Sequence, residues 1–420
     1  MNNFTTNCYE MKRKIVNFSK KMSNGLNKSN GKFVMEMQYG IAKGGSCLIS
    51  NIARSLDEDI KLNYTIDRLC DKLANLDKED CNILWNNYLN EVKKYIDKDN
   101  VIAIFDDSDI NKEYSKKLED LDRVIDASSQ DKRIVNGYHV CEANVLTKTE
   151  QQPISVYSKI YSCKSDNFTS KNAYTLESIK AVEDITDDKI TGILDRGYDD
   201  NKIFKYMTDN GHKFVVRLTD QRKLLFKGKK RNIKEVADSR KGKILFKALF
   251  DDNEEVELSL SYTRAVLPYN NEEYTLVIVY GLSEENPMKL LTNIDIKDKD
   301  DVIRVVRLYL SRWRIEEYFR GKKQEYEFEN MRVRTLQSMN NLNMMLTMHL
   351  GHIAMLAEEI NRKILSIKII EASKSLKRKV IVWLSQIARG IKEILKYAHS
   401  GIKEWQEIEH RPEFKQLSLW

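Results

Sequence analysis

"NVIAIFDDSDI", residues 100–110, is a short run of apolar and β-branched residues that ends in acidic ones. This composition predicts a β-strand with carboxylates at its carboxyl end. A second run of the same kind, "ITGILDRGYDD" at 190–200, predicts a buried strand with Asp195 at its end. In α/β sheets, sites usually lie at the carboxyl ends of strands. Asp106 and Asp195 are therefore candidate site residues, although strand-end aspartates also form turns.

The segments around these two runs predict an α/β core. Alternating residues predict strands, and longer periodic stretches predict helices. We expect strands at 137–147, 152–161 and 211–219, and helices at 171–185 and 201–210. Strands followed by a helix and another strand indicate an α/β core with helices on both faces.

Residues 222–285 are β-rich, with short turns, and predict antiparallel hairpins that form an all-β insertion within this core. A strand at 288–296 resumes the core, and the chain after about residue 299 is expected to be helical. The predicted division is an N-terminal helical region (1–95), a core (96–221 and 286–330), the insertion (222–285) and a C-terminal helical region (331–420).

The composition is that of a globular protein, with 41% hydrophobic and 32% charged residues among 420. The longest apolar stretch, 342–357, is shorter than the roughly 20 residues that span a bilayer, so we expect a buried helix there. The N-terminus lacks the pattern of a secretion signal. We therefore expect a cytoplasmic, nucleoid-associated protein whose six cysteines, which include no CxxC pair, are reduced and form no zinc site.

Two features allow contact with DNA but also have simpler interpretations. Residues 331–420 contain 15 Lys and Arg against 8 Asp and Glu, which gives this region a net charge of 15 minus 8, or +7. Such a charge fits a polyanionic partner such as nucleic acid, or a solvated helical surface. The segments "SCLISNIARSL" and "NYTIDRLCDKL" predict two short helices, which form either a DNA-reading helix-turn-helix or an ordinary pair of packed helices.

The stretch "YLSRWRIEEYFRGKK", residues 309–323, places two adjacent glutamates among basic residues. On a continuous helix over 302–325, Tyr309, Arg312, Glu316 and Lys323 form one stripe at the edge of the buried face, whereas Glu317 points toward solvent or a neighbour. A carboxylate at that edge needs a partner.

Two partners for Glu316 remain open. The first is Arg312, four residues earlier, in an intrahelical ion pair. The second is a metal ion shared with Asp106 and Asp195. Several carboxylate oxygens suit Mg²⁺ or Mn²⁺ rather than zinc, and two such ions can cleave a phosphodiester.

The spacing Tyr-(2)-Arg-(3)-Glu-(6)-Lys, formed by Tyr309, Arg312, Glu316 and Lys323, resembles the signature of bacterial cut-and-paste DDE transposases of the insertion-sequence-four family. "AIFDDSDI" and "ILDRGYDD" resemble the strands that carry the first and second catalytic aspartates of that family. The order of the segments is also similar, and the resemblance covers residues 95–350.

This resemblance implies an RNase-H-like fold with a catalytic, metal-binding triad of Asp106, Asp195 and Glu316 and two Mg²⁺ or Mn²⁺ ions. It implies hydrolytic nicking, hairpin formation and opening, and strand transfer into target DNA. It also implies a homodimer that holds the transposon ends, with end binding by the N-terminal region and DNA contact and dimerisation by the C-terminal region. The residues implied to contact DNA are Tyr309, Arg312, Lys323, Arg196, Arg217, Arg332 and Arg334, of which the last three also fit solvated surface charges.

Several alternatives remain open at this point. "FDDSD" offers both Asp106 and Asp107, which strand alternation sends to opposite faces, and alignment of the apolar run favours Asp106. Some relatives stack a tryptophan of the strand near "PMKLL" on a flipped base, whereas this chain has only Met288 or Leu290 to fill that space. The competing functions are a catalytically inactive, transposase-derived DNA-binding protein and a metal-dependent DNA nuclease.

Overall fold

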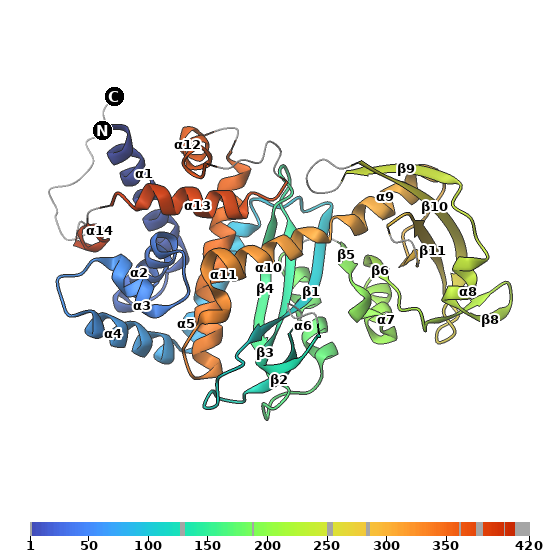
Figure 1. Ribbon diagram of the computed structural model, residues 1–420, viewed down its shortest axis with the longest axis horizontal. Helices are drawn as coiled ribbons and strands as arrows, with labels where there is room; N and C mark the ends of the chain where they lie inside the picture. The colour runs from blue at the N-terminus through green and yellow to red at the C-terminus, as the bar shows by residue number, and fades with distance from the viewer. Residues whose placement is uncertain are drawn as a thin grey trace.

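The computed structural model describes residues 2–126, 131–186, 189–249, 255–282, 286–360, 363–374, 381–398 and 400–407. The end of the predicted insertion at 283–285 and the C-terminal residues 408–420 lie outside the described residues. The fold is mixed α/β, with helices at one end, a long sheet through the middle and a β-rich part at the other end (Figure 1).

The described strands form one mixed sheet in the order β2-β3-β1-β5-β6-β12-β11-β10-β7-β8, with β4 paired to β3 and β9 paired to β10. Strands β1, β5 and β6 are parallel, and the other pairings are antiparallel. The bounds in the first half are β1 (Val101–Asn111), β2 (Asp122–Ile125), β3 (Ile134–Leu146), β4 (Pro153–Tyr161), β5 (Ile190–Leu194) and β6 (Lys213–Arg217). Of these, the short edge strand β2 was not expected from the sequence.

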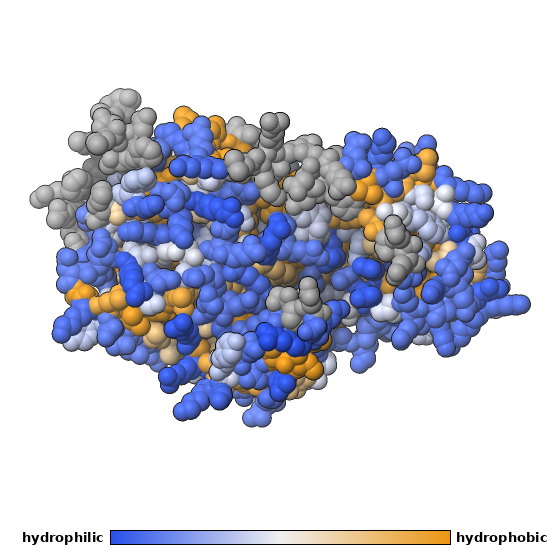
Figure 2. Space-filling view, in the orientation of Figure 1, coloured by the Kyte–Doolittle hydropathy of each residue, from blue (hydrophilic) through white to orange (hydrophobic). Residues whose placement is uncertain are grey.

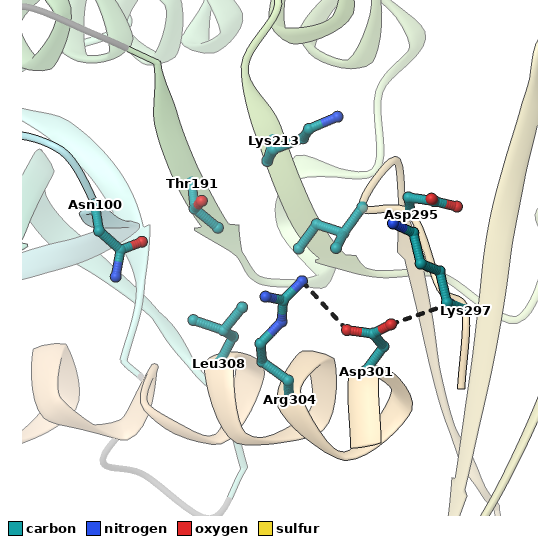
Figure 3. Close-up of a pocket in the computed structure, with 9 residues that line it drawn as sticks. Asn100, Thr191, Lys213, Asp295, Lys297, Asp301, Arg304 and Leu308 are labelled. Atoms are coloured by element: carbon teal, nitrogen blue, oxygen red, sulfur yellow. Dashed lines mark hydrogen bonds and ion pairs between the residues drawn. The ribbon is translucent and has the colours of Figure 1, made fainter. Parts of the chain in front are cut away.

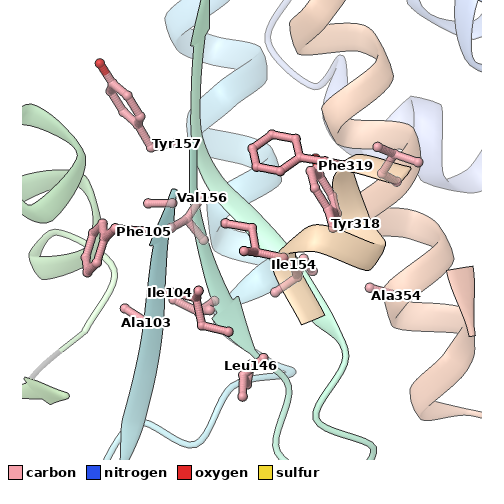
Figure 4. Close-up of a cluster of buried hydrophobic side chains, with 14 of the residues drawn as sticks. Ala103, Ile104, Phe105, Leu146, Ile154, Val156, Tyr157, Tyr318, Phe319 and Ala354 are labelled. Atoms are coloured by element: carbon pink, nitrogen blue, oxygen red, sulfur yellow. The ribbon is translucent and has the colours of Figure 1, made fainter. Parts of the chain in front are cut away.

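Helices cover both faces of this part of the sheet, as the sequence predicts. Helix α6 (Lys171–Glu183) contacts β1, β3 and β4 on one face and also packs on α7 (Asn201–Asp209). Helices α10 (Trp313–Tyr326) and α11 (Leu336–Glu358) contact β4 on the other face. Figure 4 shows Tyr318 and Phe319 of α10 on one side of β4, and Tyr157 with Phe105 of β1 on the other.

The insertion continues the core sheet, because β12 (Met288–Thr292) pairs with both β6 and β11. Its strands are β7 (Lys223–Phe226), β8 (Lys229–Asn232), β9 (Ile244–Leu249), β10 (Glu255–Val266) and β11 (Glu273–Tyr280). The prediction of an all-β insertion is wrong in one respect, since helix α8 (Ile233–Asp238) lies within it. The Asn232 side chain caps this helix by accepting a hydrogen bond from the Lys234 N–H, which stabilises its first turn.

The N-terminal and C-terminal helices pack together as one bundle beside the sheet (Figure 1). Helices α1 and α2 contact α13, and α2, α4 and α5 contact α11. The Gln38 side chain donates a hydrogen bond to the Met345 carbonyl at 2.8 Å, deep in this bundle. The bounds are α1 (Asn2–Met22), α2 (Lys28–Gly44), α3 (Ile49–Leu56), α4 (Leu62–Asn75), α5 (Lys78–Val92), α12 (Ile364–Ala372), α13 (Leu384–Leu395) and α14 (Lys403–Glu407). The boundaries at 95 and 331 therefore do not separate two helical bodies.

The predicted continuous helix over 302–325 is wrong, because the chain forms α9 (Lys299–Leu310) and α10 with a tight turn between them. The Ser311 hydroxyl donates to the Leu308 carbonyl at 2.6 Å. The Arg312 N–H, which would bond that carbonyl in an α-helix, instead donates to the Tyr309 carbonyl at 3.0 Å. Tyr309 and Glu316 therefore belong to different helices.

The surface seen in Figure 2 is mostly hydrophilic, with hydrophobic groups in several places, one of them over α12, where Ile364 and Ile367 are exposed. The stretch 342–357 lies within the buried helix α11, as the sequence predicts. No helix of the described residues combines the length and the apolar character needed to cross a membrane.

Candidate active site

Two of the predicted carboxylates meet at the centre of the sheet. In the parallel pair β1–β5, Phe105 lies opposite Leu194, so Asp106 and Asp195 follow at neighbouring positions. In the next pair, Leu194 lies opposite Val216, which places Arg217 beside Asp195 on the third strand. The register thus brings together three residues that the sequence separates by up to 111 positions.

The two adjacent aspartates of β1 face opposite sides of the sheet. Asp106 is directed toward α10, where its Oδ2 lies 3.2 Å from Nη1 of Arg312. Asp107 is paired in register with Cys141, on the side that α6 covers, and lies beside Tyr198. Only Asp106 therefore shares a face with Arg312.

Arg312 links the first and third predicted carboxylates. Its Nη1 contacts Asp106, and its Nη2 donates a hydrogen bond to Oε1 of Glu316. The intrahelical pair considered from the sequence is thus present, but the same guanidinium also reaches β1. Tyr309, at the end of α9, donates from its hydroxyl to Oδ1 of Asp195 at 3.0 Å.

The two glutamates differ in exposure from what the sequence predicts. Glu316 does not lie at a buried edge, because 56% of its side chain is exposed, whereas 20% of the Glu317 side chain is exposed. Glu317 pairs with Arg320 on the same helix. The expectation assumed a single helix that also carries Tyr309, whereas both glutamates lie on α10, which begins after the turn at Ser311 and Arg312. Glu316 is nevertheless the glutamate that lies next to Arg312.

Burial and neighbouring charges shift the pKa values of the two aspartates in opposite directions. Burial, and then the neighbouring charges of Asp195 and Asp107, raise the pKa of Asp106 to about 7, even though Arg312 acts against them. Burial also tends to raise the pKa of Asp195, but Arg312, the Arg196 N–H, the Tyr309 hydroxyl and Arg217 outweigh it and lower that pKa. The site therefore holds two close carboxyl groups, of which Asp195 ionises readily and Asp106 does so only near neutral pH.

The predicted DNA-contacting residues fall into two groups. Tyr309, Arg312 and Arg217 lie at the carboxylates, and the exposed Arg196 follows Asp195 directly. Lys323 pairs instead with Glu329, with Nζ 3.1 Å from Oε1.

Glu329 lines a cavity of about 590 Å³ together with Arg332 and Arg334. This cavity is also lined by Asn111, which lies five residues beyond Asp106 on β1, or about 16 Å along the strand. The second group is thus set apart from the first along the same strand.

Sequence reasoning did not find three lysines that share this cavity, Lys112, Lys116 and Lys117. The only signal for Lys116 and Lys117 is the basic pair in "SKKLED", which by itself indicates a solvated loop, and the buried Lys112 lies outside this pair. Met288 and Leu290, proposed to fill the space of a base-stacking tryptophan, are both buried in β12.

Another cavity, of about 640 Å³, contains none of the predicted site residues. It lies near the start of β5 and β6, where Thr191, Lys213 and Arg304 line it (Figure 3). Arg304 pairs there with Asp301 at 3.6 Å. The candidate carboxylates lie at the carboxyl end of β5, so this cavity lies at the opposite ends of the same strands.

Sequence reasoning also missed a buried ion pair behind the site. Lys322 of α10 and Glu142 of β3 are both fully buried, with Nζ 3.0 Å from Oε2. Ser158 and Ser155 add hydrogen bonds to this carboxylate. Because Glu142 is the register partner of Asp106, the pair fixes α10 over the strand that carries the first carboxylate.

Comparison with known proteins gives one family match. Residues 137–350, just over half of the chain, match the model of a family described as the transposase DDE domain. The matched range contains Asp195 and Glu316, and Asp106 precedes it. No curated protein matches the chain.

Two solved structures show weak similarity. The cryo-EM structure of a piggyBac transposase synaptic complex with hairpin DNA has a TM-score of 0.46 and 10% identity, covering 95% of this chain and 82% of that one. The NurA nuclease from Sulfolobus solfataricus has a TM-score of 0.24 and 11% identity, covering 63% of this chain and 98% of that one. At these scores neither similarity establishes a common fold.

Proposed function

The chain belongs to the transposase DDE domain family, and on that premise we propose that it cuts DNA at the ends of a mobile element and joins them to target DNA. The observation that carries the proposal is the convergence of three separated carboxylates. Asp106 and Asp195 lie side by side on parallel strands, and Arg312 links Asp106 to Glu316. We propose these three acids as the catalytic and metal-binding triad.

The strand order supports an RNase-H-like core within the larger sheet. Strand β3 runs antiparallel to both of its neighbours, β4 and β1, and β5 and β6 follow parallel to β1. The first acid then lies on the central strand β1, and the second directly follows β5. The acid on α10, Glu316, is connected to the first of them through Arg312.

The side chains present fit divalent cations. All three acids offer oxygen ligands, which Mg²⁺ and Mn²⁺ prefer. Burial and the neighbouring Asp195 and Asp107 raise the pKa of Asp106, and a bound cation would favour its ionised form. Asp106, Asp195 and Glu316 would hold two ions, which when bound would activate the attacking hydroxyl and stabilise the leaving oxygen.

The chain's own residues have separate tasks in this proposal. The Tyr309 hydroxyl holds Asp195 in place through the hydrogen bond to Oδ1. Arg312 is 15% exposed and is held against β1 by Asp106, and its bond to the exposed Glu316 would be exchanged for one to a phosphate oxygen when DNA enters. Arg217 and Arg196 would contact phosphates at the same end of β5.

The second basic group would hold DNA farther from the reacting phosphate. Arg332 and Arg334 are exposed and share their cavity with three lysines. Lys323 belongs to this group through Glu329. We propose that the DNA strand runs along β1 and α10, from this cavity to the carboxylates.

The finer assignments belong to the same proposal. The Tyr-Arg-Glu-Lys spacing favours the insertion-sequence-four family, cleavage through a hairpin and a homodimeric synaptic complex on transposon-end and target DNA. We propose no base stacking by Met288 or Leu290, since both are buried. The helical bundle formed by the N-terminal and C-terminal regions would provide DNA-end contacts and the dimer surface.

The test is a cleavage and joining assay with Mg²⁺ on DNA that carries the terminal inverted repeats flanking the gene. The wild-type protein should cut and join these ends, and Asp195→Asn and Glu316→Gln should abolish both reactions while end binding persists. Glu317→Gln is the matched control and should remain active. End binding without cleavage under any divalent ion would favour an inactive DNA-binding protein. Cleavage without joining would favour a nuclease.

A further inference from the structure

A second group of potential metal ligands lies on the other face of the sheet. Strands β2 and β4 pair with the same edge of β3, one after the other along it. The start of β2 therefore lies next to the end of β4. Asp122 begins β2, His139 lies on β3, and Cys163 follows β4. One ligand atom from each of the three lies within 4.8 Å of the other two.

Hydrogen bonds between the two strand ends hold this group in place. The backbone N–H of Cys163 donates to Oδ2 of Asp122 at 2.6 Å. The neighbouring Ser162 hydroxyl donates to the Asp120 carbonyl at 2.6 Å, and the Lys164 ammonium donates to the Leu121 carbonyl at 2.6 Å. The protein's own hydrogen bonds thus hold together the segments that carry the Asp122 carboxylate and the Cys163 thiol.

The histidine already has the orientation of a metal ligand. Its Nδ1 lies 2.8 Å from Oδ1 of Asp109, the residue paired with it on β1. Metal-binding histidines usually donate one ring N–H to a carboxylate, which directs the other nitrogen to the ion. Here that nitrogen is Nε2, which lies 3.9 Å from Oδ2 of Asp122.

The dimensions suit a small tetrahedral ion. Zinc bonds of about 2.0–2.3 Å at tetrahedral angles place ligand atoms roughly 3.3–3.6 Å apart. The separation of 3.9 Å between His139 Nε2 and Asp122 Oδ2 needs to close by about half an ångström to reach this range. The sulfur of the exposed Cys163 completes the group, within 4.8 Å of a ligand atom of each of the other two residues.

We propose that Asp122, His139 and Cys163 form a Zn²⁺ site, with Asp109 orienting the histidine and water taking the fourth position. Mixed nitrogen, oxygen and sulfur ligands suit zinc and do not suit Mg²⁺. The site fastens the edge strand β2 and the segment after β4 to β3. It is separate from the candidate catalytic carboxylates, because Asp109 and Asp106 face opposite sides of β1.

The sequence predicted no zinc site, and the ligand spacing explains why. Gaps of 17 and 24 residues separate the three ligands, and no CxxC pair marks them. Only the register of three strands brings them together. Of the six cysteines, Cys163 is the exposed one, so an ion can reach it directly from solvent.

The test uses Co²⁺ as a spectroscopic substitute for zinc in the full-length protein after removal of metals with a chelator. The wild type should show the near-ultraviolet absorbance of a thiolate–cobalt bond, and Zn²⁺ but not Mg²⁺ should displace it. Cys163→Ser should lose this absorbance, whereas Cys70→Ser, which changes a partly exposed thiol outside the group, should retain it. Asp109→Asn should weaken Zn²⁺ affinity about 10–100-fold.

Protection of the thiol gives a second readout. Zn²⁺ should slow maleimide labelling of Cys163 in the wild type and much less in His139→Gln. The catalytic variant Glu316→Gln should bind Zn²⁺ like the wild type, so the outcome does not depend on transposase activity. Absence of a thiolate–cobalt band in the wild type, or an unchanged band in Cys163→Ser, would overturn the proposal.

Discussion

Replacement of Asp106 by asparagine should stabilise the metal-free protein above neutral pH. In the unfolded chain this carboxyl loses its proton near pH 3.8, but in the fold its pKa is about 7. Between these values the folded state binds more protons than the unfolded state, so stability falls as the pH rises. At 1.36 kcal/mol per pKa unit, the free energy of unfolding is lowered by about 4 kcal/mol once the pH is above 7.

Asparagine does not ionise and avoids this penalty. Asp106→Asn should therefore match the wild type at pH 4 and gain stability over it by up to about 4 kcal/mol at pH 8. Urea unfolding followed by circular dichroism, with a chelator present, measures the difference at both pH values. A variant less stable than the wild type at pH 8, or a difference independent of pH, would refute the reasoning.

Asp195→Asn is the matched control on the neighbouring strand. Its folded pKa lies below the ordinary value, so the carboxylate adds stability that is present above pH 3.8 and is lost as the pH falls below it. This variant should be less stable than the wild type at pH 8, whereas Asp106→Asn should be more stable. Mg²⁺ should stabilise the wild type and neither variant, because only the wild type keeps both carboxylates.

Three further predictions test other parts of the fold. Lys322→Met leaves Glu142 buried without its partner and should cost about 3–5 kcal/mol in urea unfolding; equal stability would contradict the buried pair. Arg332→Ala should weaken DNA binding regardless of sequence and reduce the salt dependence of log affinity by about 1, and an unchanged salt slope would exclude a phosphate contact. Gly390→Ala places a methyl group against the Ile369 carbonyl, so thermal unfolding should show a loss of about 1–3 kcal/mol. A melting temperature equal to that of the wild type would argue against this close packing of α12 and α13.

The strands of the core could be predicted because their residues carry the information locally. The run that ends at Phe105 is apolar and β-branched, and it forms β1 where expected. The meeting of Asp106 and Asp195 could also be anticipated, since both follow such runs. The roles of these residues remain predictions until they are tested by substitution.

Other features depend on contacts that periodicity does not contain. At the turn between α9 and α10, the Ser311 hydroxyl and the Ser311 N–H both donate to the Leu308 carbonyl. The two faces of β1 could be predicted, but which face Arg312 covers follows from the packing of α10. The pairing of Lys322 with Glu142 across 180 residues had no signal in the sequence, because a lysine on a helix is usually solvated.

The most direct test of the central claim is the position of Mn²⁺ in crystals of the protein with transposon-end DNA, located by anomalous scattering. We predict Mn²⁺ bound by carboxylate oxygens of Asp106 and Asp195, with Glu316 on the same ions and Asp107 free of metal. Mn²⁺ bound by Asp107, or no Mn²⁺ at Asp106 and Asp195 when the DNA end is in place, would contradict the account.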